Sequence, residues 1–329
     1  MADLTVERLF SDPPLTGHLP VQMKFSPDGR TITYLQVGQD DRERLDLWRY
    51  SLVTGQADKW IDARDLMRSG QATAAELAER ERRRMFSSGI TSYEWSPDSS
   101  GVLVPVDGVA WLVRSDTKNV VALTGEDNRQ TDIRFSPSGR WISFVRDGDL
   151  YRLEVTTGIE QAITKDAQAG ITNGLADFIA QEEMHRFHGY WWQPDETAIV
   201  FTRVDDSRVA LSHRFEINAD GFDVMPQRYP FAGATNAEVR LGRYQFDTGT
   251  TEWIAYADDD EDYLARVDHV ADRLILQVQD RSQQQLKVKQ VTGSQAVTLW
   301  CETSPTWINL HDNLKAADKN LVWTSQRDD

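Results

Sequence analysis

Two adjacent glutamates, Glu182 and Glu183, are the residues whose type and spacing point to the most specific chemistry in this sequence. Two carboxylates directed at one ammonium group can hold it with charge-assisted hydrogen bonds, and these are strongest where water is excluded. Successive helix positions diverge by about 100°, so neighbouring carboxylates are also typical of a solvated helical turn. The pair therefore indicates either a cation-binding site or an exposed helix end.

Two other groups of residues resemble metal-binding patterns in part. His185 and His188 lie three residues apart near Glu182, which superficially resembles a Glu-x-x-His metal pair, but two such pairs on different helices would be needed. The acidic run ADDDED from Ala257 lacks the 12-residue EF-hand pattern and its closing Glu. We therefore expect no metal and no cofactor, with both groups on solvated segments.

Familiar catalytic motifs are absent from the sequence. It contains no G-x-S-x-G nucleophile elbow, no H-E-x-x-H, no Walker loop and no G-x-G-x-x-G. Cys301 is the single cysteine, which excludes an intramolecular disulfide and a thiolate zinc cluster. We accordingly assign no catalytic residue in this chain.

Composition limits the partners. The 329 residues contain 36 Lys and Arg against 52 Asp and Glu, a net charge of −16, so the average surface repels nucleic acid and anionic lipid. With 40% hydrophobic and 10% aromatic residues the chain should fold. No run of about 18 apolar residues predicts a membrane span, and the start MADLTVERLF has no secretory h-region.

A repeat predicts the elements that position the glutamates. Four segments share an aromatic residue, then Ser or Gln, then Pro and a turn, and each reads as strand, turn, strand. They are FSPDGRTITYL from Phe25, WSPDSSGVLVPV from Trp95, FSPSGRWISFV from Phe135 and WQPDETAIVFT from Trp192. Outer hairpins follow three of them, from Asp46, Trp111 and Asp149.

The repeat length identifies the architecture. Trp95 and Phe135 lie 40 residues apart, the size of one four-stranded propeller blade. Later segments, among them Phe215 to Asn218, continue the pattern. We therefore predict an all-β propeller of four-stranded blades, with five blades and the start of a sixth.

Two insertions should be helical. Residues 64–86 are rich in Ala, Leu, Glu and Arg, and their charges predict a solvated helix with Glu-to-Arg pairs. The second insertion, 175–189, predicts a helix from Asp177 to about His188, ended by Gly189, and it carries both glutamates. Because no Gly-, Ser- or Pro-rich linker divides the chain, residues 1–329 are expected to form one domain.

Two motifs resemble a known family. The stretch DFIAQEE from Asp177, followed by a Trp191-Trp192-x-Pro194 motif and by FTRVD from Phe201, is similar to the double-glutamate region of the dipeptidyl peptidase IV family. YPFAGATN from Tyr229 resembles that family's YPKAG-x-x-N stretch. The resemblance covers essentially the whole chain. It implies an eight-bladed N-terminal propeller, present here in part, and a C-terminal α/β-hydrolase domain.

The same resemblance implies roles for the glutamates. Glu182 and Glu183 would bind the free N-terminal ammonium of a peptide from which the parent enzyme releases X-Pro or X-Ala dipeptides. The family's Ser, Asp and His triad has no counterpart before Asp329, so this chain should be inactive alone. Some members also use an arginine for the substrate carbonyl, but this chain has Val106-Asp107-Gly108 there, and no such arginine is carried over.

Several possibilities remain open at this point. The expected partners are a peptide with a free N-terminus, the hydrolase domain of the same protein, and a second copy bound through the open side of an incomplete propeller, where strand edges would be unpaired. The alternative is a stand-alone propeller that binds proteins and has no peptidase activity. Localisation is undetermined between the periplasm and the cytoplasm of a bacterium.

Overall fold

The structure is a computed structural model that describes residues 4–11, 15, 19–38, 41, 43–67, 81, 84, 87–117, 119–125, 130–318 and 320–325. The chain divides into two compact units. One contains Met1–Phe144 and Leu153–Ile159, and the other contains Val145–Arg152 and Glu160–Asp329. Each unit has a buried apolar core of its own.

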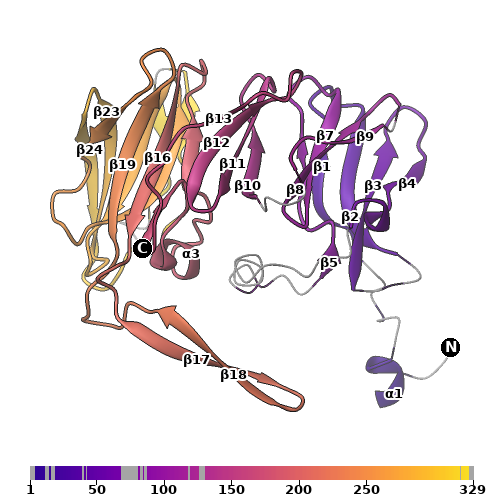
Figure 1. Cartoon of the computed structure of the whole chain (residues 1–329), viewed down its shortest axis with the longest axis horizontal. Coiled ribbons are helices and arrows are strands. Elements are labelled where there is room, and N and C mark those ends of the chain that lie inside the picture. Colours follow the sequence, from indigo (N-terminus) through magenta and orange to yellow (C-terminus); the bar gives the residue numbers. More distant parts are fainter. Residues whose placement is uncertain are drawn as a thin grey trace. The chain divides into compact units, whose positions relative to one another are not determined.

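The first unit contains two antiparallel sheets of consecutive strands (Figure 1). The first sheet comprises β1 (Val21–Phe25), β2 (Thr31–Val37), β3 (Arg44–Ser51) and β4 (Ala57–Ile61), with β5 (Ser88–Gly89) parallel to β3. The second comprises β6 (Glu94–Trp95), β7 (Gly101–Val106), β8 (Val109–Arg114) and β9 (Val120–Ala122). The unit also contains a short helix, α1 (Val6–Leu9), and a 3₁₀ turn, Ala63–Asp65.

The third sheet comprises β10 (Thr131–Phe135), β11 (Trp141–Arg146), β12 (Asp149–Glu154) and β13 (Glu160–Ala162), and the division between the units falls inside it. The division therefore follows no linker. The single-domain organisation over 1–329 stays a prediction.

The repeated turns are built from the same hydrogen bonds. The Ser26 hydroxyl donates to Asp28 at 2.6 Å and accepts the N–H of Thr31 at 3.0 Å. The turn that begins at Ser96 repeats both bonds, to Asp98 and from Gly101. A Ser-Pro sequence thus closes each strand pair with its own side chain, as the turn pattern predicts.

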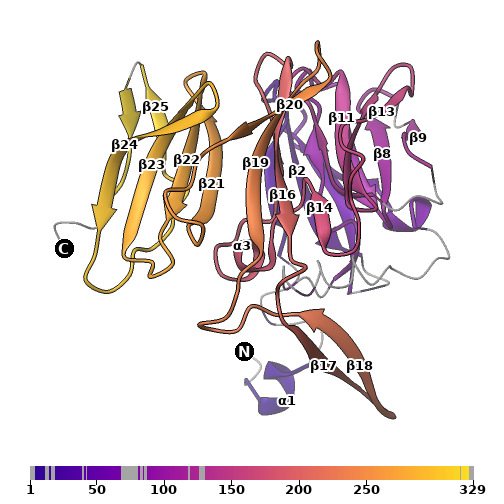
Figure 2. The same ribbon diagram turned by 60° about the vertical axis from the view of Figure 1, so that its left-hand side comes forward.

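The second unit contains the elements around the glutamates. Its first sheet has the order β14 (Ile171–Asn173), β16 (Ala198–Asp205), β19 (Glu238–Gln245) and β20 (Thr250–Ile254), with β15 (Tyr190–Trp192) also paired to β16. The next sheet comprises β21 (Tyr263–Val270), β22 (Arg273–Gln279), β23 (Gln285–Thr292) and β24 (Gln295–Thr303), as Figure 2 shows. A two-stranded pair follows, β25 (Lys315–Ala317) and β26 (Asn320–Val322). Apolar side chains of the first two sheets share one core, which includes Val200, Leu241, Leu264 and Leu276.

One two-stranded hairpin stands out from this unit (Figure 1). β17 (Leu211–Asn218) and β18 (Gly221–Arg228) pair in register along their full length and belong to no larger sheet. Phe215 and Phe222 contact each other edge to face at 5.4 Å, yet each is about 60% exposed. The prediction that Phe215 to Asn218 continues a blade is therefore wrong, because the chain leaves the sheet after β16 and returns to it with β19.

The pattern of blades agrees with the sequence. Within the described residues there are five antiparallel sheets of four or five strands, followed by the β25–β26 pair. The predicted helix over 64–86 lies mostly outside the described residues. In the described part of the chain, no helix combines the length and the apolar character required to cross a membrane.

Candidate functional site

Glu182 and Glu183 lie at the end of a very short helix, α3 (Phe178–Glu182). Asp177 caps its start, with the side chain accepting the N–H of Ala180 at 3.2 Å. A helix of five residues is not stable by itself in water, so its contacts with the rest of the fold must hold it. Glu182 is its last residue and is half-buried, whereas Glu183 is exposed.

The helix is shorter than predicted, and Gly189 does not end it. His185 adopts a positive φ of 53°, and the N–H of Arg186 turns back to the carbonyl of Ala180 at 2.8 Å. A histidine thus takes the left-handed position after the helix that glycine more often occupies. The chain leaves α3 directly after the glutamates, and this places them on the turn.

Gly189 instead closes the base of the segment. A Cβ on this residue would lie 2.4 to 2.5 Å from backbone atoms of Gly174 and Leu175, so no larger side chain fits without a shift. The amide of Thr202 donates to the Gly189 carbonyl at 2.8 Å, and the amide of Gly174 donates to the Thr202 carbonyl at 2.8 Å. Residues 174–189, which we call the glutamate loop, therefore leave and rejoin the sheet at one closed point.

Arg186 fills the inside of the glutamate loop and is 5% exposed. Its guanidinium donates to the carbonyls of His188 (2.7 Å) and Leu264 (3.2 Å) and pairs with Asp177 at 3.3 Å. It also lies 5.8 Å from the ring centre of Trp191. Burial lowers the pKa of Arg186 from its usual value, and the neighbouring Asp177 carboxylate opposes that change.

The two sequence stretches that resemble the family come together in space. Phe178 of the glutamate loop contacts Tyr229 edge to face, with ring centres 5.3 Å apart. Tyr229 in turn contacts Phe231 at 4.8 Å. The stretches DFIAQEE and YPFAGATN therefore form one region of the surface, although about 50 residues separate them in the chain.

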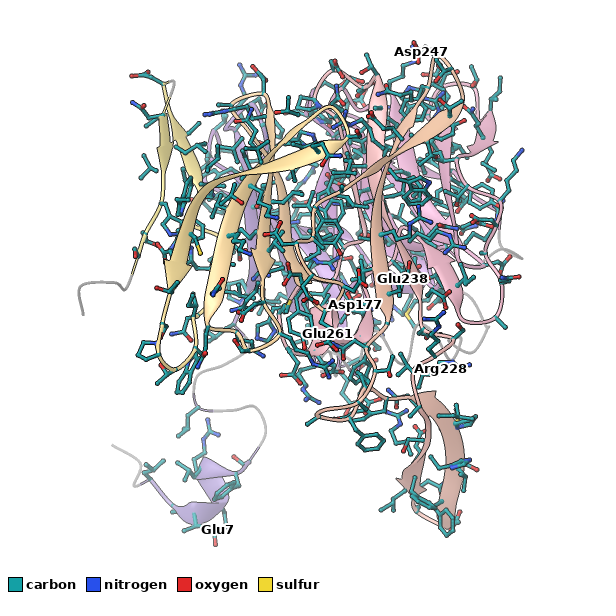
Figure 3. All side chains as sticks on the ribbon, turned by 90° about the vertical axis from the view of Figure 1, so that its left-hand side faces the viewer. Glu7, Asp177, Arg228, Glu238, Asp247 and Glu261 are labelled. Carbon is teal, nitrogen blue, oxygen red and sulfur yellow. The ribbon has the colours of Figure 1, made fainter. Side chains whose placement is uncertain are left out.

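A cavity of about 610 Å³ adjoins this region. Asp177, Ile179 and Met184 of the glutamate loop form part of its wall, and the segment from Gly233 to Arg240 forms another part. Figure 3 shows three of the acidic lining residues, Asp177, Glu238 and Glu261, at the same end of the unit. Glu182 and Glu183 do not line this cavity, so the carboxylates singled out from the sequence lie outside it.

Two polar contacts order the cavity wall. The side-chain amide of Asn236 donates to the hydroxyl of Tyr263 at 3.3 Å, and Arg281 pairs with Glu261 at 2.6 Å. Deep in the wall, the hydroxyl of Tyr256 donates to the carbonyl of Val239 at 2.8 Å, and burial raises the pKa of Tyr256. These contacts leave the cavity with mixed charge and an excess of carboxylates.

The structure places the histidines away from a metal-binding arrangement. His185 is exposed on the turn, and the carbonyl of His188 is used by Arg186. Within the described ranges, no group of three or more His, Cys, Asp or Glu side chains could hold a metal ion. The absence of a metal and of a cofactor stays a prediction.

Sequence reasoning missed two contributors to this site. Arg186 was not singled out, although an arginine within the run MHRFHGYWW, rich in apolar and aromatic residues, is a signal of a buried and paired charge. Thr202 was also missed. Its hydroxyl lies 2.8 Å from the carbonyl of Leu175 and 3.1 Å from that of Gly189, which no local pattern reveals.

Comparisons with known proteins identify the family. The family model described as "Dipeptidyl peptidase IV (DPP IV) N-terminal region" matches residues 96–329. Dipeptidyl aminopeptidase A of Saccharomyces cerevisiae is 24% identical over 209 residues, which are 58% of this chain and 22% of the yeast protein. Human dipeptidyl peptidase 8 is 25% identical over 253 residues, which are 65% of this chain and 28% of the human protein.

A solved structure shows the fold. Dipeptidyl peptidase 4 of Porphyromonas gingivalis superimposes with a TM-score of 0.68 at 22% identity, over 87% of this chain and 40% of that one. This likeness confirms the all-β propeller fold class, and this chain spans well under half the length of these proteins. The double-glutamate and YPFAGATN stretches both lie within the matched residues, so the predicted resemblance is confirmed. The chain belongs to the dipeptidyl peptidase IV family, as part of its N-terminal region.

Proposed function

We propose that this chain is the substrate-recognition propeller of a serine-type dipeptidyl aminopeptidase that releases X-Pro or X-Ala dipeptides, and that Glu182 and Glu183 bind the substrate's free N-terminal ammonium. One observation carries the proposal. Two adjacent carboxylates lie on a turn that is anchored at its start, its end and its base by buried polar contacts. Two carboxylates on an anchored turn suit a ligand of fixed geometry.

The location of the carboxylates in the helix supports a binding role. Negative side chains are unfavourable near the C-terminus of a helix, where cations are preferred. Glu182 and Glu183 occupy that end of α3 and therefore contribute nothing favourable to its stability through the helix dipole. Capture of a cation would explain two acidic residues there.

The exposure of Glu183 suggests that a second protein surface covers the glutamates when the ligand binds. An ion pair between exposed groups contributes only about 0–1 kcal/mol in water, whereas a hydrogen bond to a charged group in a drier site contributes about 1.5–3 kcal/mol. Because Glu183 is exposed in this chain, strong binding of an amine requires another surface that excludes water. We propose that the C-terminal hydrolase domain of the same protein provides this surface, together with the Ser, Asp and His triad.

The length of a dipeptide is consistent with amine binding by this chain and cleavage by the covering domain. An extended chain covers at most about 3.3–3.6 Å per residue, so an anchored amine places the second peptide bond roughly 7 Å away. A nucleophile on the covering domain at that distance would select cleavage after two residues. Specificity for dipeptides would then follow from the distance between two fixed groups.

The proposal is tested in the full-length protein with the double variant Glu182→Gln and Glu183→Gln. Two charge-assisted hydrogen bonds of about 1.5–3 kcal/mol each predict a fall in kcat/KM of about 10²- to 10⁴-fold for a substrate with a free amine. The desamino analogue of the same substrate should be cleaved equally by the variant and the wild type. Glu216→Gln with Asp220→Asn, on the exposed hairpin, is the charge-matched control.

The outcome that contradicts the amine site is a double variant with unchanged preference for the free amine. Sequencing the reading frame past Asp329 tests the rest of the proposal. A continuation with a G-x-S-x-G elbow would agree with it, and a stop codon would favour the stand-alone binding propeller.

We also propose that the protein associates with a second copy of itself. Light scattering over a range of protein concentrations measures this association. A monomer at high concentration would contradict it.

A further inference from the structure

Arg186 joins three parts of the structure through one planar group. Its contact with Asp177 holds the residue that caps the start of α3, and its contact with the carbonyl of His188 holds the chain after the turn. Its third contact reaches the carbonyl of Leu264 on β21, 78 residues away in sequence and in the neighbouring sheet. The start of the helix, the end of the turn and the next sheet therefore have one common anchor.

The glutamates lie between the points that Arg186 holds. Asp177 precedes Glu182 by five residues, and Arg186 follows Glu183 by three. The side chain of Asp177 uses one oxygen for the helix cap and the other for the guanidinium. A shift of Arg186 would therefore move both ends of the turn that carries the carboxylates.

Stability alone does not account for a buried arginine here. Replacing a buried ion pair by well-packed apolar residues is often neutral or stabilising, because removing charges from water is costly. An apolar side chain in place of Arg186 would join an apolar interior that already exists in the glutamate loop, since Ala180 and Met184 are 1% and 4% exposed. The guanidinium contributes orientation, because its N–H donors have fixed directions in one plane and can hold several acceptors at defined positions.

We propose that Arg186 is a positioning residue for amine recognition, which sets the location of Glu182 and Glu183 relative to β21. The inference rests on the proposed function. It assigns no substrate contact to Arg186. Lysine cannot take over the role, because its ammonium is a single point on a flexible stem and does not match three separate acceptors.

The test uses the full-length protein and three variants. Arg186→Lys keeps the charge, Arg186→Met keeps the approximate length of the side chain without charge, and Arg146→Met is the matched control. Arg146 forms a bidentate pair with Glu160 on strands β11 and β13, with a side chain 14% exposed, and these strands belong to a different sheet from the one that carries the glutamate loop. KM and kcat are measured for a free-amine substrate and for its desamino analogue, together with the melting temperature.

We expect Arg186→Lys to raise KM for the free-amine substrate about 10- to 100-fold, with kcat within about twofold, because misplacing a binding group by about 1 Å can cost that much. Cleavage of the desamino analogue should not change. Arg146→Met should lower the melting temperature without changing either KM. If Arg186→Met does not fold, the comparison of Arg186→Lys with the wild type still tests the inference.

A folded Arg186→Lys protein with wild-type KM for the free-amine substrate would overturn the inference. This failure is distinguishable from failure of the proposed function. If the double glutamine variant loses its amine preference and Arg186→Lys keeps it, only the positioning role is wrong. If the double glutamine variant keeps the preference, the amine site itself is wrong and the positioning role falls with it.

Discussion

The glutamate loop (174–189) and the β17–β18 hairpin (211–228) are both excursions from the sheet that contains β16, and they are stabilised in opposite ways. The loop has five helical residues and little other regular structure, yet its interior holds a buried arginine and its base is closed by Thr202. The hairpin is fully paired but mostly exposed. Regular hydrogen bonding is therefore a poor guide to which segment is held in place.

The glutamate loop and the hairpin illustrate two roles that an insertion in a sheet can have. Buried polar contacts that converge on one loop fix a few side chains in space, as a binding site requires. A hairpin with Phe215, Ile217 and Phe222 at 60%, 85% and 61% exposure instead presents apolar surface. We expect the glutamate loop and the hairpin to differ in their contributions to the free energy of unfolding as they differ in contacts.

Asp177→Ala should have the largest effect. It removes the partner of the buried Arg186 and the cap of α3, and loss of one member of a buried pair costs about 3–5 kcal/mol. The matched change at the base of the hairpin is Asp206→Ala, which removes a partly exposed pair with Arg228 (side chains 42% and 36% exposed) and should cost less, about 1 kcal/mol. Urea denaturation measures both, and equal losses would contradict the contrast.

Gly189→Ala should destabilise the protein by about 1–3 kcal/mol. The new methyl group would meet the backbone of Gly174 and Leu175, which cannot move without opening the base of the loop. Gly221→Ala on the hairpin meets nothing within 4 Å, so its effect should lie within about 0.5 kcal/mol. Thermal unfolding of the two variants gives the difference, and a similar loss at both positions would refute the closed base.

Hydrogen exchange should distinguish the segments without any mutation. The amides of Gly174 and Thr202 at the base of the loop should exchange at least about tenfold more slowly than the amides of β17 and β18, since an isolated two-stranded hairpin is only marginally stable. Residue-resolved exchange monitored by NMR measures this. Equal protection would show that the hairpin is packed against something in solution.

The smallest expected effect concerns pH at the base of the hairpin. The hydroxyl and N–H of Ser207 donate hydrogen bonds to Asp205 and lower the pKa of that carboxyl. Because the folded pKa lies below the unfolded value, this contribution to stability is present above about pH 4 and is lost as the pH falls through the folded pKa. Ser207→Ala should raise the pKa of Asp205, as measured by carboxyl-carbon NMR titration; an unchanged pKa would contradict the assignment.

The sequence predicts the parts of this molecule that depend on local order. The Ser-Pro turns and the start of α3 at Asp177 are set by neighbours within five residues, and the blade spacing follows from the repeat of the Ser-Pro segments along the chain; each is confirmed. The end of α3 was not predictable, because His185 adopts a conformation that glycine usually takes. Arg186 was missed for a different reason: its partner Leu264 is 78 residues away, and no local pattern encodes that contact.

The in-register pairing of β17 with β18 also bears on how the chain folds during synthesis. β16 ends at Asp205 and β19 begins at Glu238, so their pairing must close a long loop, and the entropy cost of closure rises with loop length. A hairpin forms within microseconds from neighbouring residues and brings Leu211 opposite Arg228. Once formed, the hairpin shortens the loop that the pairing of β16 with β19 must close.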